Sequence, residues 1–125
     1  MFWHINCKSK EKNNRYSLMI KVMERRFALE VLESKVPVVV EFFTEWSGSA
    51  FIIAELLYAL EKKYAGDVKF VIVNMDESEQ LRRSYGVKKI PTILFFKDGE
   101  VVGQLEGIHP RSKIEEAIEN VLKNQ

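Results

Sequence analysis

Residues 38–50 read VVVEFFTEWSGSA, and this stretch decides the fold. Its first six residues are β-branched or aromatic except for Glu41, a composition typical of a strand buried on both faces. A polar loop from Thr44 to Ser49 follows. Apolar residues then recur at helical spacing, which predicts a helix from about Ala50 to Tyr64.

The sequence on either side of this stretch continues the alternation of strands and helices. It predicts strands over residues 16–22, 68–73, 92–96 and 101–102, and helices over residues 23–34, 78–85 and 110–122. Gly86 is placed to end a helix in a left-handed conformation, and Asp98-Gly99 is a strong signal for a tight hairpin. Pro110 suits the first turn of the last helix.

Alternating strands and helices followed by a closing hairpin predict an α/β fold. We expect a central mixed β-sheet of four to five strands with helices on both faces, and right-handed crossovers between its parallel strands. Residues 1–15 are polar, basic and without periodicity, which predicts a flexible N-terminal tail. Residues 16–125 are then a single domain, as their number allows.

The charge balance excludes several classes of function. The chain has 19 Lys and Arg against 18 Asp and Glu, a net charge of +1, which argues against a dedicated nucleic-acid-binding protein. No apolar run is long enough to cross a bilayer, and the N-terminus lacks the pattern of a secretory signal. We therefore expect a cytoplasmic monomer without a transmembrane segment.

The residues that commonly bind metals are few and scattered. The histidines are His4 and His109, and Cys7 is the single cysteine, so the sequence predicts neither a metal site nor an internal disulfide. No cofactor is implied. Cys7 is expected to be accessible in the tail. An incidental cysteine is the simpler interpretation, and thiol chemistry at Cys7 is the alternative.

Several short motifs follow one another in an order that resembles the thioredoxin family. They are Phe42-Phe43-Thr44-Glu45-Trp46, Asn74-Met75-Asp76, Tyr85-Gly86-Val87, Ile90-Pro91-Thr92, Lys97-Asp98-Gly99-Glu100 and Gly107. The resemblance covers about Met19 to Leu122. It implies the thioredoxin fold, a cis peptide bond before Pro91, and a groove for an extended peptide or protein partner. By resemblance, Trp46, Gly48, Ser49, Ile90, Pro91 and Gly107 line that groove.

The active-site motif departs from the family's Trp-Cys-Gly-Pro-Cys. Ser47 stands at the position of the attacking cysteine, Ala50 at that of the resolving cysteine, and Ser49 at that of the proline. Disulfide exchange needs a thiolate to attack and a second thiol to release the mixed disulfide. A serine hydroxyl and an alanine methyl supply neither, so a dithiol cycle at this loop is not expected.

Positions that support the chemistry in the family are kept only in part. Glu41 matches the family's buried acid, either as a retained proton carrier or, as we favour, as a remnant without a thiol to serve. Ile72 stands where a lysine often accompanies that acid. Glu55 replaces a proline that commonly kinks the following helix, and Phe51 replaces a basic residue.

Ser47 as a hydrolytic nucleophile is a weaker interpretation than Ser47 or Ser49 as a helix cap, since no histidine lies nearby in sequence. His109 is expected to precede or cap the last helix.

Two functions remain open. The first is a binding module that uses the groove without thiol chemistry. The alternative is a thiol-disulfide oxidoreductase whose cysteines at positions 47 and 50 have been substituted.

Overall fold

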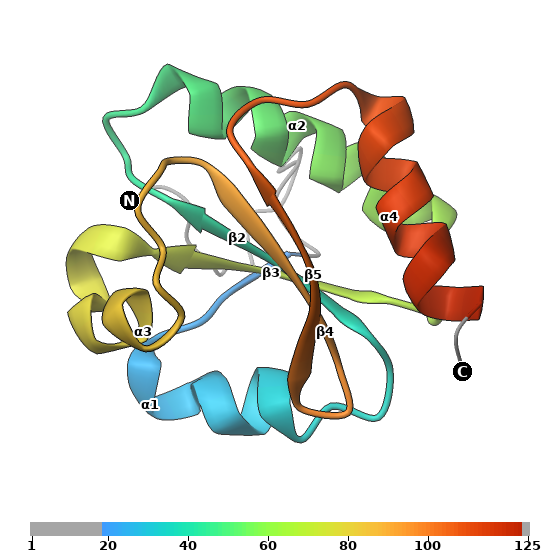
Figure 1. Ribbon diagram of the computed structural model, residues 1–125, viewed down its shortest axis with the longest axis horizontal. Helices are drawn as coiled ribbons and strands as arrows, with labels where there is room; N and C mark the ends of the chain where they lie inside the picture. Colours follow the sequence, from blue (N-terminus) through green and yellow to red (C-terminus); the bar gives the residue numbers. More distant parts are fainter. Residues whose placement is uncertain (1–18, 124–125) are drawn as a thin grey trace, which may run out of the picture.

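The computed structural model describes residues 19–123. Its elements alternate along the chain as the sequence predicts, and they form one five-stranded sheet with helices on both sides (Figure 1). In chain order the elements are β1 (Ile20–Lys21), α1 (Glu24–Phe27), the π-helix η1 (Ala28–Leu32), β2 (Val38–Phe43), α2 (Gly48–Lys63), β3 (Lys69–Asn74), the 3-10 helix η2 (Met75–Glu77), α3 (Glu79–Ser84), β4 (Thr92–Lys97), β5 (Glu100–Glu106) and α4 (Arg111–Lys123).

The sheet has the order β1-β3-β2-β4-β5 and is mixed. Strands β1 and β2 both run parallel to β3, whereas β4 is antiparallel to β2 and to β5. All six residues of β2 are buried, because this central strand is covered on both faces. The mixed α/β sheet predicted from the sequence is therefore confirmed.

Two apolar clusters hold the layers together, one on each face of the sheet. Alternate β2 residues divide between them: Val39 and Phe43 face α2 and α4, and Val38, Val40 and Phe42 face α1, η1 and α3. Figure 1 shows the corresponding arrangement, with α2 and α4 on one side of the sheet and α1 and α3 on the other.

The segment predicted as one helix over residues 23–34 is instead a short α-helix that widens into a π-helix. Glu33 N–H donates to the Ala28 carbonyl at 2.8 Å, a spacing of five residues. The Glu30 carbonyl, which an α-helix would pair with residue 34, accepts from Lys69 Nζ at 2.9 Å. Lys69 on β3 therefore supplies a partner for this carbonyl within the wider turn.

The predicted strand over residues 16–22 is also shorter than expected within the described part of the chain, where β1 comprises two residues. Residues 1–15 and their expected tail character, with His4 and Cys7, lie outside the described residues.

Two glycine-containing turns fix the connections around β4. Gly86, at a φ of 63°, follows α3, and the bonds from Gly86 N–H to the Arg83 carbonyl and from Val87 N–H to the Arg82 carbonyl close a Schellman motif. Asp98 and Gly99 have φ values of 53° and 82°, and two consecutive positive values are those of the tight hairpin turn that the sequence predicts.

Among the described residues, no helix is both long and apolar enough to cross a membrane.

Candidate functional site

Three loops that carry the predicted site residues converge at one end of the sheet. The loop after β2 leads into α2, the segment after α3 leads into β4, and the loop after β5 leads into α4 (Figure 1). The end of β2 and the start of β4 are neighbours, with Phe42 opposite Thr92, and Thr92 in turn lies opposite Glu106 at the end of β5. The structure therefore brings Ser47, Pro91 and Gly107 to the same edge.

Ser47 is the N-cap of α2. Its Oγ accepts a hydrogen bond from Ala50 N–H at 3.2 Å, and its backbone is extended, with φ −98° and ψ 114°. This satisfies one of the backbone donors that a helix start leaves without a partner. The capping interpretation is therefore confirmed for Ser47, whereas Ser49 lies within the first turn of the helix.

Ala50 is buried in the cluster beneath α2, with 1% of its surface exposed. It presents a methyl group where disulfide exchange would need a thiol, and Ser47 is half-buried and committed to the cap. His109 lies between β5 and α4, where its Nε2 is 2.9 Å from the Glu106 carbonyl oxygen. Its position before the last helix agrees with the prediction.

Glu41 is the most unusual side chain near the site. It is fully buried, and neither carboxylate oxygen has a hydrogen-bond partner in the structure. Its direct neighbours across the sheet are Ile72 on β3 and Ile93 on β4, so the position where the family often has a lysine is apolar here. Burial raises the pKa of the Glu41 carboxyl well above its ordinary value of 4.5 because the charged form loses its hydration.

The peptide bond between Ile90 and Pro91 is cis, as the resemblance implies. Two hydrogen bonds hold this segment in place. Thr92 Oγ1 donates to the Lys89 carbonyl at 2.7 Å, and Gly107 N–H donates to the Pro91 carbonyl at 2.8 Å. Gly107 has a φ of 83°, so its place in this loop suits a residue without a side chain.

Each of the three converging loops carries an apolar side chain that is exposed or half-buried. Trp46 is 75% exposed, Ile90 is half-buried, and Ile108 is 54% exposed. We call these three residues the apolar rim. Ile108 was not among the residues predicted from the sequence, although its place directly after Gly107 could have indicated it. Gly48 is exposed and Ser49 half-buried in the first turn of α2 beside the rim.

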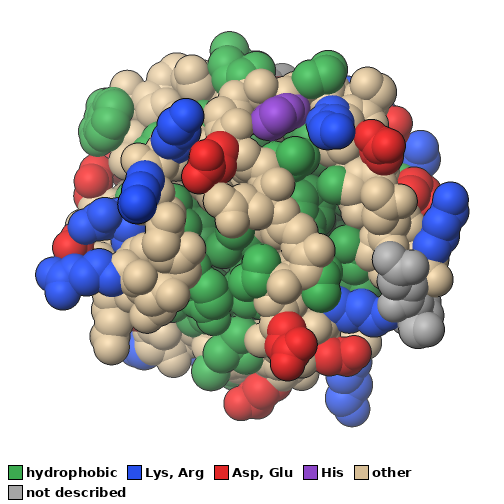
Figure 2. Space-filling view, in the orientation of Figure 1, with side chains coloured by type: hydrophobic (Ala, Val, Ile, Leu, Met, Phe, Trp, Pro, Cys, Tyr) green, Lys and Arg blue, Asp and Glu red, His purple; other side chains and the backbone are tan. Residues whose placement is uncertain are grey.

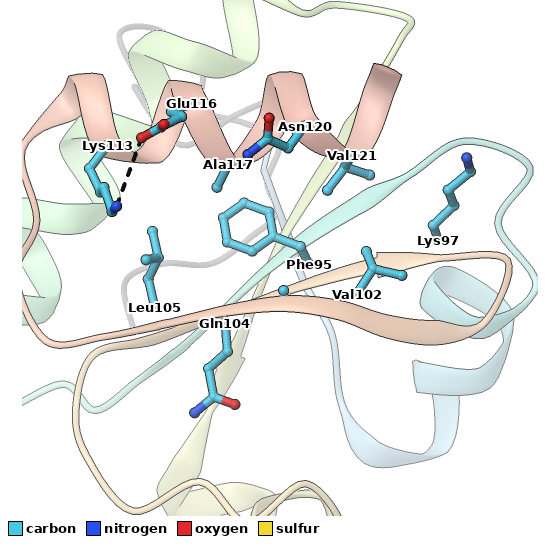
Figure 3. A pocket seen from close by; sticks show the side chains of 11 residues that line it. Phe95, Lys97, Val102, Gln104, Leu105, Lys113, Glu116, Ala117, Asn120 and Val121 are labelled. Carbon is cyan, nitrogen blue, oxygen red and sulfur yellow. Dashed lines mark ion pairs between the residues drawn. The ribbon is translucent and has the colours of Figure 1, made fainter. Parts of the chain in front are cut away.

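A separate cavity of about 360 Å³ lies between β5 and α4 (Figure 3). Phe95 and Leu105 point into it, whereas Gln104 points to the other face of the sheet. Gly103 helps to keep it open, because a Cβ at this position would lie 3.4 Å from the Phe95 ring. Its lining comes from β4, β5 and α4, so it is distinct from the three converging loops.

Within residues 19–123, no group of three or more His, Cys, Asp or Glu side chains is arranged to hold a metal ion. One other carboxyl in the described part of the chain has a raised pKa. Burial raises the pKa of Glu61, on the last part of α2, to about 7. Glu61 lines a hollow with Gly66 and Phe70, away from the three loops.

Comparison with known proteins agrees with this architecture. Residues 18–120 match the family model described as Thioredoxin. The chain is 35% identical over 106 residues to Thioredoxin 1 of Nostoc sp., covering 85% of this chain and 99% of that protein. It is 34% identical over 106 residues to Thioredoxin 1 of Synechococcus elongatus, with the same coverage of 85% and 99%.

A third relative is Thioredoxin C-2 of Corynebacterium nephridii, which is 38% identical over 96 residues, or 77% of this chain and 89% of that protein. The fold and the converging loops define an α/β protein with a cis-proline before β4. The matches identify its family. The chain belongs to the thioredoxin family. Its one cysteine, Cys7, stands outside the site loop.

Proposed function

We propose that this protein is a binding module of the thioredoxin family that holds an extended peptide or protein segment without thiol chemistry. One observation carries the proposal. The cis peptide bond before Pro91 is kept, whereas Ser47 and Ala50 stand at the positions of the family's two cysteines. Binding to such an edge needs backbone groups and apolar contacts, and it does not need a thiol.

The apolar rim supplies the contact area. Trp46 exposes three quarters of its surface on one loop, and Ile108 exposes about half of its surface on another. Large exposed apolar side chains on converging loops are typical of interaction sites, and tryptophan is enriched among the residues that dominate binding energy.

Binding to a synthetic library of peptides of about twelve residues, with a reducing agent present, tests this function. We expect the parent chain to retain a defined subset. The double variant Trp46→Ala, Ile90→Asp should bind that subset at least about tenfold more weakly, because it loses both apolar contacts. Circular dichroism checks that the variant is folded.

Leu29→Ala is the matched control, because Leu29 is 54% exposed but lies on η1 at a distance from the three loops. Its binding should equal that of the parent. The proposal is wrong if the parent chain retains no peptide, or if Leu29→Ala weakens binding as much as the double variant does.

A further inference from the structure

The segment from α3 to β4 carries four basic side chains, and two of them lack a counter-charge. Arg82 Nη2 and Arg83 Nε both contact Glu79 Oε2, at 2.8 and 3.1 Å. Lys88 and Lys89 are exposed, and within residues 19–123 neither ammonium lies within ion-pair distance of a carboxylate. Figure 2 shows basic side chains gathered over this part of the molecule.

The backbone that carries the two lysines is held firmly. The Lys89 carbonyl accepts from Thr92 Oγ1, and the next peptide bonds lead through Ile90 to the cis-Pro91 that Gly107 anchors. A segment bound along Ile90 therefore passes next to Lys88 and Lys89. The fold therefore fixes the backbone positions of Lys88 and Lys89 relative to the apolar rim.

The other charges at this end of the molecule limit the kind of ligand. Glu45 is exposed beside Trp46, and Glu106, which accepts from Gln104 Nε2 at 3.2 Å, ends β5. A single-stranded nucleic acid could stack on Trp46, but its continuous phosphate charge would also meet both carboxylates. A peptide can place its acidic residues next to the lysines and keep the rest of its length neutral or apolar.

We infer that the site selects extended peptides that carry one or two acidic residues beside an apolar residue, with Lys88 and Lys89 as the specificity-determining pair. This inference rests on the proposed function of the same site. Exposed ion pairs are individually weak, so the pair adjusts a preference that the apolar rim makes possible.

Two peptide series of about twelve residues test it, one with Asp or Glu near an apolar residue and one with each acid replaced by Lys. We expect the parent chain to bind the acidic series about fivefold more tightly at low salt, because two exposed ion pairs together have that effect. The double variant Lys88→Glu, Lys89→Glu should reverse the preference. High salt should reduce it in both proteins.

The variant Lys35→Glu, Lys123→Glu changes the net charge equally, and both lysines lie at the other end of the sheet, before β2 and at the end of α4. It should keep the parent's preference. Equal binding of both series by the parent, or the same reversal in this control, overturns the inference and leaves the proposed function standing. If the parent chain retains neither peptide series, both the inference and the proposed function are wrong. Retention of a single-stranded dT oligomer in place of peptides, dependent on Lys88 and Lys89, also overturns the peptide assignment.

Discussion

Glu41 places a carboxyl group in a layer of the sheet that is otherwise apolar. Its pKa is raised by desolvation, so the folded protein keeps the proton over a pH range in which the unfolded chain releases it. Above the ordinary pKa of 4.5, the folded state therefore binds more protons than the unfolded state, and stability falls as pH rises until the folded-state pKa is passed. Near neutral pH, Glu41 weakens the fold.

Glu41→Leu should therefore stabilise the protein at neutral pH. We expect Glu41→Leu to be more stable than the parent even below pH 4.5, because the protonated carboxyl is buried without hydrogen-bond partners. Above pH 4.5 the difference should grow by about 1.4 kcal/mol per pH unit, the slope for one proton. Leucine fills a similar volume and needs no partner. Urea unfolding, followed by circular dichroism at several pH values from about 4 to about 8, measures this difference in the free energy of unfolding.

Two further variants control this measurement. Glu41→Gln also removes the titration, but it leaves a buried amide without partners and should be less stable than Glu41→Leu. A residual slope up to about pH 7 should persist in Glu41→Leu because of Glu61, and Glu61→Gln should remove it. If Glu41→Leu is no more stable than the parent at the highest pH, the carboxylate has a partner in solution.

At the scale of the element, α2 depends on the hydroxyl of Ser47 at its start. Ser47→Ala removes the bond to Ala50 N–H and should reduce the free energy of unfolding by about 1 kcal/mol. Ser49→Ala is the matched control within the same turn and should be neutral or slightly stabilising, because alanine favours the helix interior. Urea unfolding of both variants tests the assignment. Equal losses in the two would show that the cap bond does not carry the effect.

At the scale of the whole molecule, the scaffold should still accept the family's two thiols. In a Cys7→Ser background, Ser47→Cys with Ala50→Cys places two thiols one helical turn apart at the start of α2. We expect them to oxidise to an internal disulfide, and the thiol at position 47 to have a lowered pKa because it lies at a helix N-terminus. Titration of free thiols before and after oxidation measures the disulfide, and absorbance against pH measures the pKa.

Cys7→Ser alone should have no reactive thiol in either state, since Cys7 is the single cysteine of the chain. Two thiols that stay reduced under an excess of glutathione disulfide would mean that the loop no longer has the geometry that the fold suggests. That result would count against the view that only the chemistry of the motif has changed.

Much of the fold could be predicted from the sequence, because several short stretches each determine their own local structure. The apolar run at β2, the glycine after α3 and the Asp98-Gly99 turn each specify their own conformation. The π-helix could not be predicted in this way, because its local sequence carries no such signal and its Glu30 carbonyl finds a partner in Lys69, which lies far along the chain.

The candidate site, too, could be predicted from the sequence only in part. The cis bond before Pro91 and the positions of Ser47 and Ala50 followed from the family motif. The absence of hydrogen-bond partners around both Glu41 oxygens depends on what packs from the other strands, so only the structure could show it. The same is true of Ile108, whose exposure is decided by how the loop leaves β5.

The strand β5 lies at an edge of the sheet, and this position affects how copies of the protein would associate. In the described sheet β5 has one strand neighbour, and Val101 and Val102 on it are exposed, a composition that invites pairing between copies. If two copies paired antiparallel about Gly103, Glu100 of each would stand opposite Glu106 of the other. The resulting repulsion at both ends of the shared strand opposes aggregation, so the two glutamates act as gatekeepers of the open edge.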